Sequence, residues 1–344
     1  MKILITGGSG FIGSALIRHF IDNTQHHIIN VDKLTYASQL CGLADHQGDE
    51  HYTFYQHDIC DAEKLTQILI THSPDVIFHL AAESHVDRSI TGSQPFINTN
   101  IVGTFTLLES ARAYWSALPE TKQADFRFIH VSTDEVYGDL PFAEQEGEPS
   151  KFTESSPYLP NSPYSASKAA SDHMMRAWHR TYGFPSIITH CSNNYGSYQH
   201  PEKLIPRMIS CALDGKSLPV YGEGKQVRDW LHVDDHVSAL IAVMEKGQLG
   251  EVYNIGGDCE MSNLTLVKQL CRVLNELFQK DTDYQNQIKF VTDRLGHDRR
   301  YAIDNHKICS ELGWAPKTDF TLGLRNTVKW YLDNPLWRCI EGDA

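Results

Sequence analysis

The chain has 344 residues, of which 41% are hydrophobic and 21% charged, and its formal net charge is −13. This composition is typical of a globular protein with a sizeable core, and the acidic excess argues against a nucleic-acid-binding surface. The apolar runs are far shorter than a membrane span, and glycines interrupt the first of them before a secretory segment could form. We therefore expect a cytoplasmic protein that does not bind membranes.

The cysteines and histidines lack the spacing of a metal site. None of the eight cysteines belongs to a Cys-x-x-Cys pair, which predicts reduced and mostly buried thiols rather than disulfides. They are Cys41, Cys60, Cys191, Cys211, Cys259, Cys271, Cys309 and Cys339. The 18 histidines show no His-Glu-x-x-His spacing, so we expect no catalytic metal.

Short apolar runs alternate with helical patterns along the first part of the chain. Strands are expected at Lys2–Thr6, Ile28–Asp32, Thr53–Gln56, Val76–Leu80, Phe126–Ser132 and Ser186–Cys191. Helices are expected at Phe11–Ile21, Ala62–Thr71, Gly103–Ser116 and Tyr164–Tyr182. This alternation predicts an α/β fold with a doubly wound, Rossmann-like parallel sheet.

After Cys191 the pattern loosens, with glycine and proline interrupting it. Helices are expected at Val233–Lys246 and Asn263–Phe278, and a strand at Val252–Ile255 could return to the main sheet. We therefore expect a smaller, partly interleaved second domain.

The segment "ITGGSGFIG" follows the first predicted strand and opens the first helix. Gly7, Gly8, Gly10 and Gly13 stand where a backbone must turn tightly and approach a pyrophosphate, at the positive end of the helix. A plain structural turn is the alternative, but Asp32 ends the second strand, where a carboxylate binds ribose hydroxyls and repels a 2′-phosphate. The pattern predicts dinucleotide binding and favours NAD over NADP.

Two further strand ends would meet the same cofactor. Asp58 and Ile59 follow the third strand, and the "HLAAES" segment from His79 to Ser84 follows the fourth. Without the glycine loop, ordinary loop chemistry would explain both segments equally well.

The segment "SPYSASK" places Tyr164 and Lys168 four residues apart, on one face of a predicted helix. A phenol has a pKa of about 10 in water, and a neighbouring ammonium would favour its ionised form. By itself, such spacing is more often that of a tyrosine and a lysine that lie side by side on the protein surface. Downstream of an NAD loop, it predicts a base that acts on a substrate hydroxyl.

The segment "VSTDEVYG" places Thr133, Asp134 and Glu135 at the end of the fifth predicted strand. Neighbouring side chains of a regular strand point to opposite faces, so both carboxylates can reach one substrate only if the strand has ended. We expect an irregular turn at 133–135.

The sequence resembles the extended short-chain dehydrogenase/reductases nearly from end to end. Among them it is most similar to the nucleotide-sugar 4,6-dehydratases, through "VDKLTYA", "LAAESHVDRSI", "STDEVYGDL", "SPYSASKAASDH", "NNYG", "EKLIPRMI", "GKQVRDWLHVDDH", "EVYNIGG" and "GHDRRYAID". The resemblance implies dTDP-glucose as substrate, a tightly bound NAD that each turnover regenerates, and a homodimer formed through the helices near Gly103–Ser116 and Tyr164–Tyr182. The apolar positions of those helices could equally be core.

The resemblance also assigns roles to residues. It implies that Tyr164 and Lys168 act in oxidation at C4 of the sugar, that Thr133 assists, that Glu135 removes the C5 proton and that Asp134 protonates the leaving C6 hydroxyl. The cofactor-binding residues that it implies are Gly7, Gly10, Phe11, Ile12, Gly13, Asp32, Lys33, Leu34, Thr35, Asp58, Ile59, Leu80, Ala81, Ala82, Ser84, Thr99, Tyr164, Lys168 and Asn194. The substrate-binding residues that it implies are Ser84, Thr133, Asn193, Glu202, Lys203, Leu204, Pro219, Val220, Tyr221, Arg228, Asn263, Asp293, Arg294 and His297.

On this basis, residues 1–191 and about 229–251 would form the NAD-binding domain, and 192–228 and 252–344 the nucleotide-sugar-binding domain. Ser9, Ser197, His200 and Leu295 depart from the family's usual residues, and the last two flank substrate-holding segments. The choice between thymine and uracil bases therefore stays open. The alternatives are a UDP-glucose 4,6-dehydratase, a nucleotide-sugar 4-epimerase and a regulatory NAD-binding protein.

Overall fold

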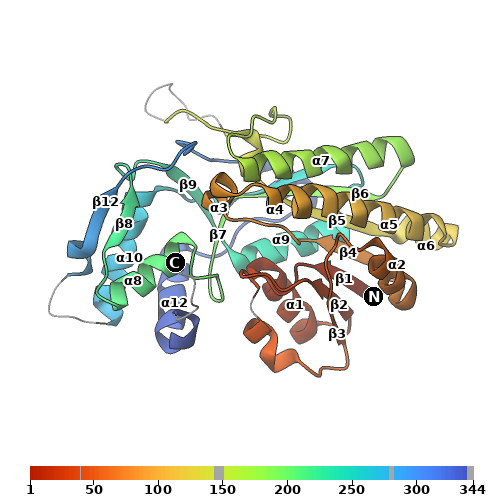
Figure 1. Ribbon diagram of the computed structural model, residues 1–344, viewed down its shortest axis with the longest axis horizontal. Helices are drawn as coiled ribbons and strands as arrows, with labels where there is room; N and C mark the ends of the chain where they lie inside the picture. The colour runs from red at the N-terminus through yellow and green to blue at the C-terminus, as the bar shows by residue number, and fades with distance from the viewer. Residues whose placement is uncertain (39, 143–150, 279–282, 339–344) are drawn as a thin grey trace.

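The computed structural model describes residues 1–38, 40–142, 151–278 and 283–338. Its main feature is a seven-stranded sheet in the order β10-β6-β5-β4-β1-β2-β3, in which every neighbouring pair is parallel (Figure 1). The strands are β1 (Lys2–Thr6), β2 (His27–Asp32), β3 (Tyr52–Gln56), β4 (Val76–His79), β5 (Arg127–Thr133), β6 (Ser186–Cys191) and β10 (Val252–Ile255). The order of the strands across the sheet reverses between β1 and β4, which is the type of switch point at which α/β sheets bind ligands.

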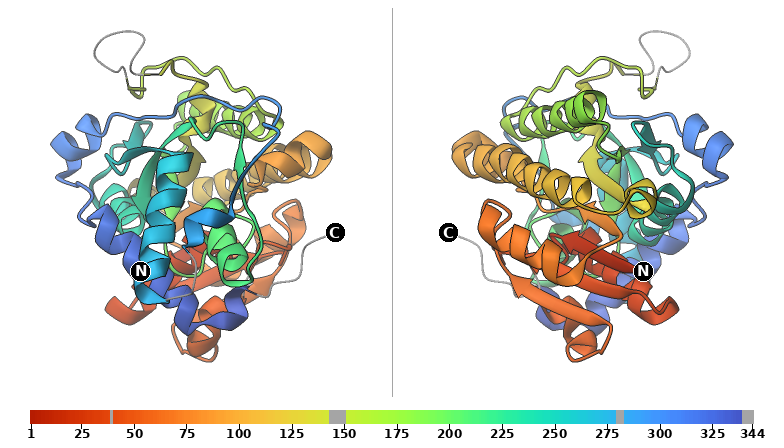
Figure 2. Two further views of the ribbon diagram at one scale, coloured as in Figure 1. Left: turned by 90° about the vertical axis from the view of Figure 1, so that its left-hand side faces the viewer. Right: turned by 90° about the vertical axis from the view of Figure 1, so that its right-hand side faces the viewer.

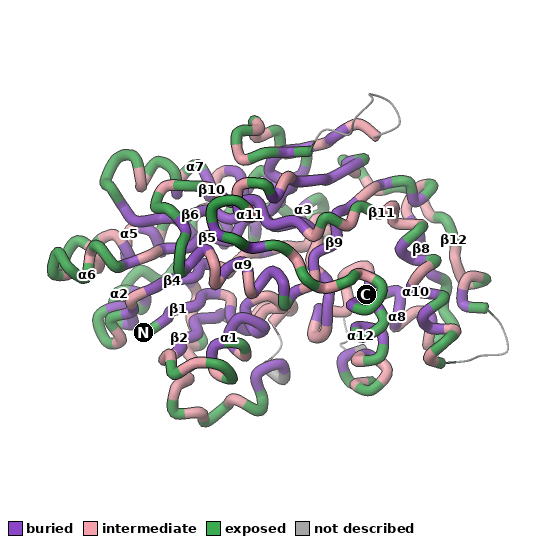
Figure 3. The backbone as a smooth tube through the Cα atoms, turned by 180° about the vertical axis from the view of Figure 1, so that it is seen from behind, coloured by how far each residue is buried: buried purple, intermediate pink, exposed green. Residues whose placement is uncertain are grey.

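Helices cover both faces of this sheet because its strands are apolar on both sides. One face is covered by α1 (Phe11–Asn23), α9 (Val233–Lys246) and α11 (His306–Leu312), which pack on Ile3, Ile5 and Phe78. The other is covered by α2 (Ala62–His72), α5 (Thr104–Ser116) and α7 (Pro163–Tyr182), which pack on Leu4, Ile77 and Phe128. In Figure 3 the strands form the buried centre between these layers.

Shorter elements complete this part of the molecule. They are the 3₁₀ helices η1 (Leu40–His46) and η3 (Asp134–Tyr137), the helices α3 (Val86–Thr91), α4 (Gln94–Phe96) and α6 (Glu120–Asp125), and the π-helical segment η2 (Ile97–Gly103).

A smaller unit lies against the carboxyl ends of the strands, and its helices stand in front of the sheet in the left view of Figure 2. Its core is formed by α8 (Leu204–Leu213), α10 (Asn263–Leu277) and α12 (Phe320–Asp333). Its strands are β7 (Asn193–Tyr195), β8 (Leu218–Tyr221), β9 (Val227–His232), β11 (Glu260–Ser262) and β12 (Ile288–Val291). They form a sheet of order β11-β9-β7 and the pair β12-β8. This part also contains two 3₁₀ helices, η5 (Tyr284–Gln287), which precedes β12, and η6 (Pro335–Arg338), which follows α12.

The predicted doubly wound fold is confirmed, and the six expected strands of the first part lie in the main sheet. The strand expected at Val252–Ile255 also returns to that sheet and pairs with β6. The proposed domain boundaries stay a proposal, and they would need to give 252–255 to the larger unit. Residues 279–282 and 339–344 of the second domain lie outside the described residues.

The prediction of mostly buried thiols is wrong for the described cysteines. Cys191 and Cys271 are buried, but Cys60 is exposed and Cys211, Cys259 and Cys309 are half-buried; none of these six forms a disulfide. The side chain of Cys41 and all of Cys339 lie outside the described residues. Spacing along the chain carries no information on burial, so the sequence could not separate these environments.

The described part of the chain contains no helix long and apolar enough to cross a membrane. Within the same residues, no group of three or more His, Cys, Asp or Glu side chains could hold a metal ion.

Candidate active site

The glycine loop lies between β1 and α1, where side chains would collide with backbone. Gly7 has φ of +73°, and a Cβ there would lie 2.6 Å from the nitrogen of Ala81. A Cβ at Gly13 would lie 2.3 Å from the carbonyl oxygen of Gly7. Only glycine avoids both the strained φ and these contacts. The loop therefore lets backbone N–H groups at the start of α1 face a ligand.

Asp32 fixes this loop from the end of β2. Its Oδ2 accepts a hydrogen bond from the Ser9 amide at 2.9 Å, and its Oδ1 accepts one from the Leu34 amide at 2.8 Å and one from the Ser38 hydroxyl at 2.9 Å. A carboxylate can accept about four hydrogen bonds. Asp32 therefore holds the loop and still has capacity for a ribose hydroxyl.

A cavity of about 290 Å³ lies over the carboxyl ends of the strands, at the switch point. The predicted residues that line it are Gly7, Gly10, Phe11, Ile12, Gly13, Asp32, Lys33, Thr35, Ile59, Leu80, Ala81, Ala82, Ser84, Thr99, Thr133, Glu135, Tyr164, Lys168, Asn193, Asn194, Glu202 and Lys203. The cavity thus joins the glycine loop to the Tyr–Lys pair and to part of the acid segment. Leu34 and Asp58, also predicted to bind the cofactor, do not line it.

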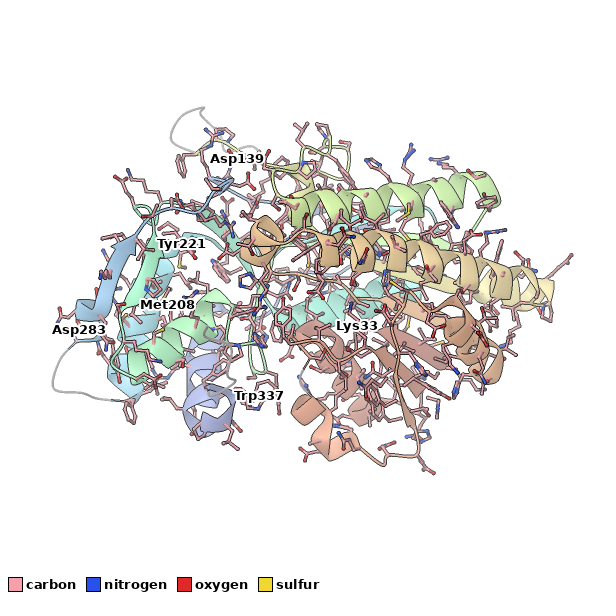
Figure 4. The ribbon with its side chains drawn as sticks, in the orientation of Figure 1. Lys33, Asp139, Met208, Tyr221, Asp283 and Trp337 are labelled. Atoms are coloured by element: carbon pink, nitrogen blue, oxygen red, sulfur yellow. The ribbon has the colours of Figure 1, made fainter. Side chains whose placement is uncertain are left out.

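Lys33 is held by side chains around this cavity. Its Nζ donates a hydrogen bond to Thr99 Oγ1 at 2.7 Å and lies 3.7 Å from a carboxylate oxygen of Asp58 and 3.9 Å from one of Glu83. Figure 4 labels Lys33 at the sheet and Tyr221 in the smaller unit. Both units contribute to the site, because Lys33 of the larger unit and Glu202 and Lys203 of the smaller unit line the same cavity.

Tyr164 and Lys168 lie in the first turns of α7, whose start the sequence specifies. Ser162 and Ser165 form a reciprocal capping box, and Pro163 occupies the first helical turn. Lys168 is buried, and its Nζ donates to the carbonyl oxygen of Val131 at 2.9 Å. This contact ties the lysine to β5, the strand that ends directly before the acid pair.

The turn expected at 133–135 is present. β5 ends at Thr133, and the 3₁₀ helix η3 begins at Asp134, so the two carboxylates do not alternate across a strand. Thr133 Oγ1 accepts from the Glu135 amide at 3.3 Å and caps this turn. Asp134 is buried, and its Oδ2 has no hydrogen-bond partner among the described residues. A buried oxygen of this kind fits a ligand hydroxyl.

The two carboxyl groups differ in electrostatic environment. Burial, reinforced by Glu135, raises the pKa of Asp134 well above its ordinary value. Burial also raises the pKa of Glu135, but Arg294, Arg228 and then Lys203 oppose it. Glu135 is therefore the better carboxylate base, and Asp134 the better acid.

The hydroxyl of Tyr164 is also perturbed. Burial and then Glu135 raise its pKa well above the ordinary value, while a hydrogen bond with Thr133 lowers it. Burial lowers the pKa of Lys168, and Asp172, one turn later on α7, opposes this change. A phenolate at Tyr164 therefore needs positive charge close by.

The predicted substrate-binding residues fall into two sets. Ser84, Thr133, Asn193, Glu202 and Lys203 line the cavity, where Lys203 Nζ donates to the Ser84 carbonyl oxygen at 3.0 Å. The second set does not line it and belongs to the smaller unit: Leu204, Pro219, Val220, Tyr221, Arg228, Asn263, Asp293, Arg294 and His297.

Asp87 links the second set to the larger unit. It accepts a hydrogen bond from the Tyr221 hydroxyl at 3.2 Å and one from Arg294 Nη1 at 3.3 Å. Arg228 is buried, and its Nη2 donates to the Asp298 carbonyl oxygen at 3.0 Å. Both guanidinium groups lower the pKa of Glu135, so these two residues of the second set lie within electrostatic reach of that carboxylate.

Sequence reasoning missed some residues at the site. Val31, Ala37, Ser38, His57, Val131, Ser132, Cys191, Ser192, Gln199 and His200 also line the cavity. Four of them, Val31, His57, Ser132 and Ser192, stand next to a predicted residue near a strand end, and this proximity was the available signal. Asp87 was harder to predict from the sequence, because its partners Tyr221 and Arg294 lie more than 130 residues away along the chain.

The side chains present fit a dinucleotide. Backbone segments approach closely at Gly7 and Gly13, where any Cβ would fill the space that a pyrophosphate could use. Asp32 lies next to this loop, where its carboxylate could bind a ribose hydroxyl. Tyr164 and Lys168 lie at the other end, beside the acid pair.

The fold and this site define an enzyme of the extended short-chain dehydrogenase/reductase class. The family model described as GDP-mannose 4,6 dehydratase matches residues 4–327. A dTDP-glucose 4,6-dehydratase of Shigella flexneri is 58% identical over 340 residues, which cover 98% of this chain and 94% of that protein. The chain belongs to the nucleotide-sugar 4,6-dehydratase family, among relatives named dTDP-glucose 4,6-dehydratase.

Solved structures agree with this assignment. A dTDP-glucose 4,6-dehydratase of Streptomyces venezuelae, crystallised with NAD bound, superposes with a TM-score of 0.87 at 44% identity and covers 98% of both chains. A UDP-glucose 4-epimerase of Thermotoga maritima gives a TM-score of 0.83 at 29% identity and covers 97% of this chain and 100% of its own. The fold is thus shared with epimerases, and the site residues must separate the two activities.

Proposed function

We propose that this protein converts dTDP-glucose into dTDP-4-keto-6-deoxy-glucose with NAD as a bound cofactor. The observation that carries the proposal is the acid pair of η3: Glu135 lines the same cavity as Tyr164 and Lys168, and Asp134 is buried next to it in the chain without lining that cavity. An epimerase needs the Tyr–Lys pair but no acid and base next to it. The identity of 58% to a dTDP-glucose 4,6-dehydratase supports the same choice.

The glycine loop, Asp32 and Lys168 hold the cofactor in this proposal. When bound, NAD accepts a hydride from C4 of the sugar and later returns it to C6. The positive charge of Lys168, four residues after Tyr164 on α7, would favour the ionised form of that tyrosine.

Tyr164 begins the reaction by taking the proton of the C4 hydroxyl. Thr133 is bonded to the acid pair: its hydroxyl donates to Asp134 Oδ1 at 3.4 Å and accepts from the Glu135 amide at 3.3 Å. Its hydroxyl also lowers the pKa of Tyr164. Its hydroxyl can orient the substrate oxygen at C4. The ketone formed at C4 makes the proton at C5 acidic.

The acid pair then removes water. Glu135 takes the C5 proton, and Asp134 gives its proton to the C6 hydroxyl, which leaves as water. The raised pKa of Asp134 keeps it protonated until this step, whereas three cations favour the carboxylate of Glu135. Glu135 can return a proton to C5 after the hydride reaches C6.

We also propose that two copies associate through α5 and α7. Phe105 and Tyr182 are exposed there, and their rings lie 6.0 and 5.8 Å from that of Trp178. An exposed aromatic row on neighbouring helices is typical of an association surface. The cytoplasmic location remains a prediction from the sequence.

The test is turnover of dTDP-glucose by the purified holoenzyme without added NAD. The proposal predicts a 4-keto-6-deoxy product, identified by NMR and by the loss of water in the mass spectrum. A product with inverted C4 and unchanged mass would contradict it and indicate an epimerase. A parallel assay with UDP-glucose measures base preference, and faster turnover of UDP-glucose would overturn the choice of dTDP-glucose.

A further inference from the structure

A loop of the smaller unit, residues 196–203, forms one wall of the cavity. Gln199, His200, Glu202 and Lys203 line the cavity, whereas Tyr198 does not. Tyr198 has φ of +69°, a left-handed conformation that costs free energy for a residue with a side chain. The mechanism gives this residue no role, so its packing must explain the conformation.

The ring of Tyr198 lies in a cluster that spans both units. The guanidinium carbon of Arg18 stands 4.1 Å from the ring centroid, and the rings of Trp330 and Trp337 lie 4.4 and 5.1 Å away. Arg18 is itself fixed, because its Nη1 donates to the Gly42 carbonyl oxygen at 2.9 Å. Figure 4 labels Trp337 beside α12, on the side of the sheet.

This contact joins the two walls of the cavity. Arg18 belongs to α1, the helix that begins at the glycine loop, whereas Tyr198 belongs to the loop opposite. A cation over an aromatic face is attracted by the ring quadrupole, more strongly when both groups are shielded from water. Separating the walls would break this contact and expose the tryptophans.

Two neighbouring contacts hold the same loop. The ring of His200 meets the edge of Tyr36 at 5.9 Å, and the guanidinium of Arg88 lies 3.8 Å from the Tyr36 ring centroid. Arg88 Nε also lies 3.3 Å from a carboxylate oxygen of Glu202. The loop is therefore held at His200 and Glu202 as well as at Tyr198, and Lys203 also holds it through the Ser84 carbonyl oxygen. Tyr198 differs from the other three residues because it does not line the cavity.

We propose that Arg18 and Tyr198 are positioning residues that hold loop 196–203 over the cofactor cavity and slow the release of NAD. The inference rests on the proposed function, in which the cofactor is regenerated at each turnover and has no need to leave. Retention then keeps the holoenzyme active without supply of free NAD. A contact of this kind corresponds to about a 3- to 30-fold change in release rate.

The experiment measures exchange of bound NAD against excess isotope-labelled NAD in the holoenzyme. Tyr198→Leu removes the aromatic face and should release NAD about 3- to 30-fold faster. Tyr198→Phe keeps the face and should release NAD at nearly the rate of the unaltered protein. Arg18→Met leaves the aromatic cluster intact, should behave like Tyr198→Leu, and keeps the test available if the leucine variant folds poorly.

The matched control is Lys307→Met. It removes a cation–aromatic contact of 4.9 Å with Tyr253, on β10 and away from the cavity lining. Equal exchange rates in the unaltered protein and the Tyr198→Leu and Arg18→Met variants would overturn the proposal. Faster exchange in all variants, Lys307→Met included and in step with lower melting temperatures, would also overturn it, because general destabilisation would explain the result.

Failure of this inference is distinguishable from failure of the proposed function. If only the inference fails, the unaltered protein still carries NAD and forms the 4-keto-6-deoxy product. If the proposed function fails, it carries no NAD or forms another product, whatever the exchange rates of the variants.

Discussion

At the scale of residues, Asp134 and Glu135 show how environment separates two adjacent carboxyl groups. Asp134 is the more deeply buried and has an oxygen without a partner among the described residues. Glu135 lines the cavity and lies within reach of two arginines and a lysine. Charge and burial therefore assign acid and base roles that the residue types alone leave equivalent.

If Glu135 is the base, its loss should slow the removal of water but not the oxidation at C4. Glu135→Gln should still permit oxidation at C4, so that reduced nicotinamide accumulates, while water loss slows by about 10²- to 10⁴-fold. Absorbance of the reduced nicotinamide and rapid-quench product analysis measure the two steps. The control is Glu251→Gln, an exposed glutamate paired with Lys307. Water loss at an unchanged rate in Glu135→Gln would show that another group is the base.

At the scale of elements, the connection from β1 to α1 depends on close backbone approach. Gly13→Ala would place a Cβ 2.3 Å from the Gly7 carbonyl oxygen, so the loop must shift. We expect a loss of about 1–3 kcal/mol in the free energy of unfolding together with weaker NAD binding. Denaturant unfolding and NAD titration measure the two effects.

Gly92→Ala is the control for this loop. A Cβ at Gly92 would lie 3.9 Å from its nearest neighbour, the Arg88 carbonyl oxygen, and the residue is exposed. Gly92→Ala should leave both the free energy of unfolding and the affinity for NAD nearly unchanged. If Gly13→Ala bound NAD as the unaltered protein does, the glycine loop would not be the cofactor site.

The elements of the main sheet were predictable because each carries a local signal. The strand of Lys2–Thr6 and the helix of Val233–Lys246 were predicted with the observed bounds, since apolar period and turn residues mark their ends. The carboxyl ends of parallel strands meet at one edge, so the glycine loop, Thr133 and the loop after β4 could be placed together in advance.

The smaller unit was harder to predict from local pattern. β7 and β11 have three residues each, and β12 pairs with β8 from about 70 residues away. Such strands are defined by partners distant in the chain rather than by their own sequence. The Arg18–Tyr198 contact and the bridge through Asp87 were missed for the same reason.

At the scale of the whole molecule, the aromatic row on α5 and α7 predicts a dimer. Phe105→Glu should convert the dimer into a monomer, because a carboxylate at that surface would have to lose its hydration on association. Light scattering after size exclusion gives the mass. Leu322→Glu, at an exposed position on α12, is the control and should leave the mass unchanged. A monomer before substitution, or a dimer after it, would contradict the prediction.

Buried histidines predict how stability changes with pH. Burial lowers the pKa of His130 to about 4 and that of His236 to about 3. The unfolded chain binds these protons near pH 6.5 and the folded protein does not, so stability is present above about pH 6.5 and falls as the pH drops toward 4. Each such histidine contributes about 3–4 kcal/mol to this loss.

Denaturant unfolding between pH 7 and pH 4 measures this dependence. His236→Gln should make the pH dependence shallower, whereas His306→Gln, at an exposed position, should leave it unchanged. An equally steep dependence in both variants would show that other groups control the acid response.

In the proposed reaction, one bound cofactor removes hydrogen from C4 and returns it to C6 within a turnover. The direct measurement uses dTDP-glucose deuterated at C4, the holoenzyme and no added NAD, with NMR and mass spectrometry of the product. We predict that the deuterium is at C6 of a 4-keto-6-deoxy sugar. Deuterium lost to solvent, or retained at C4, would contradict the account.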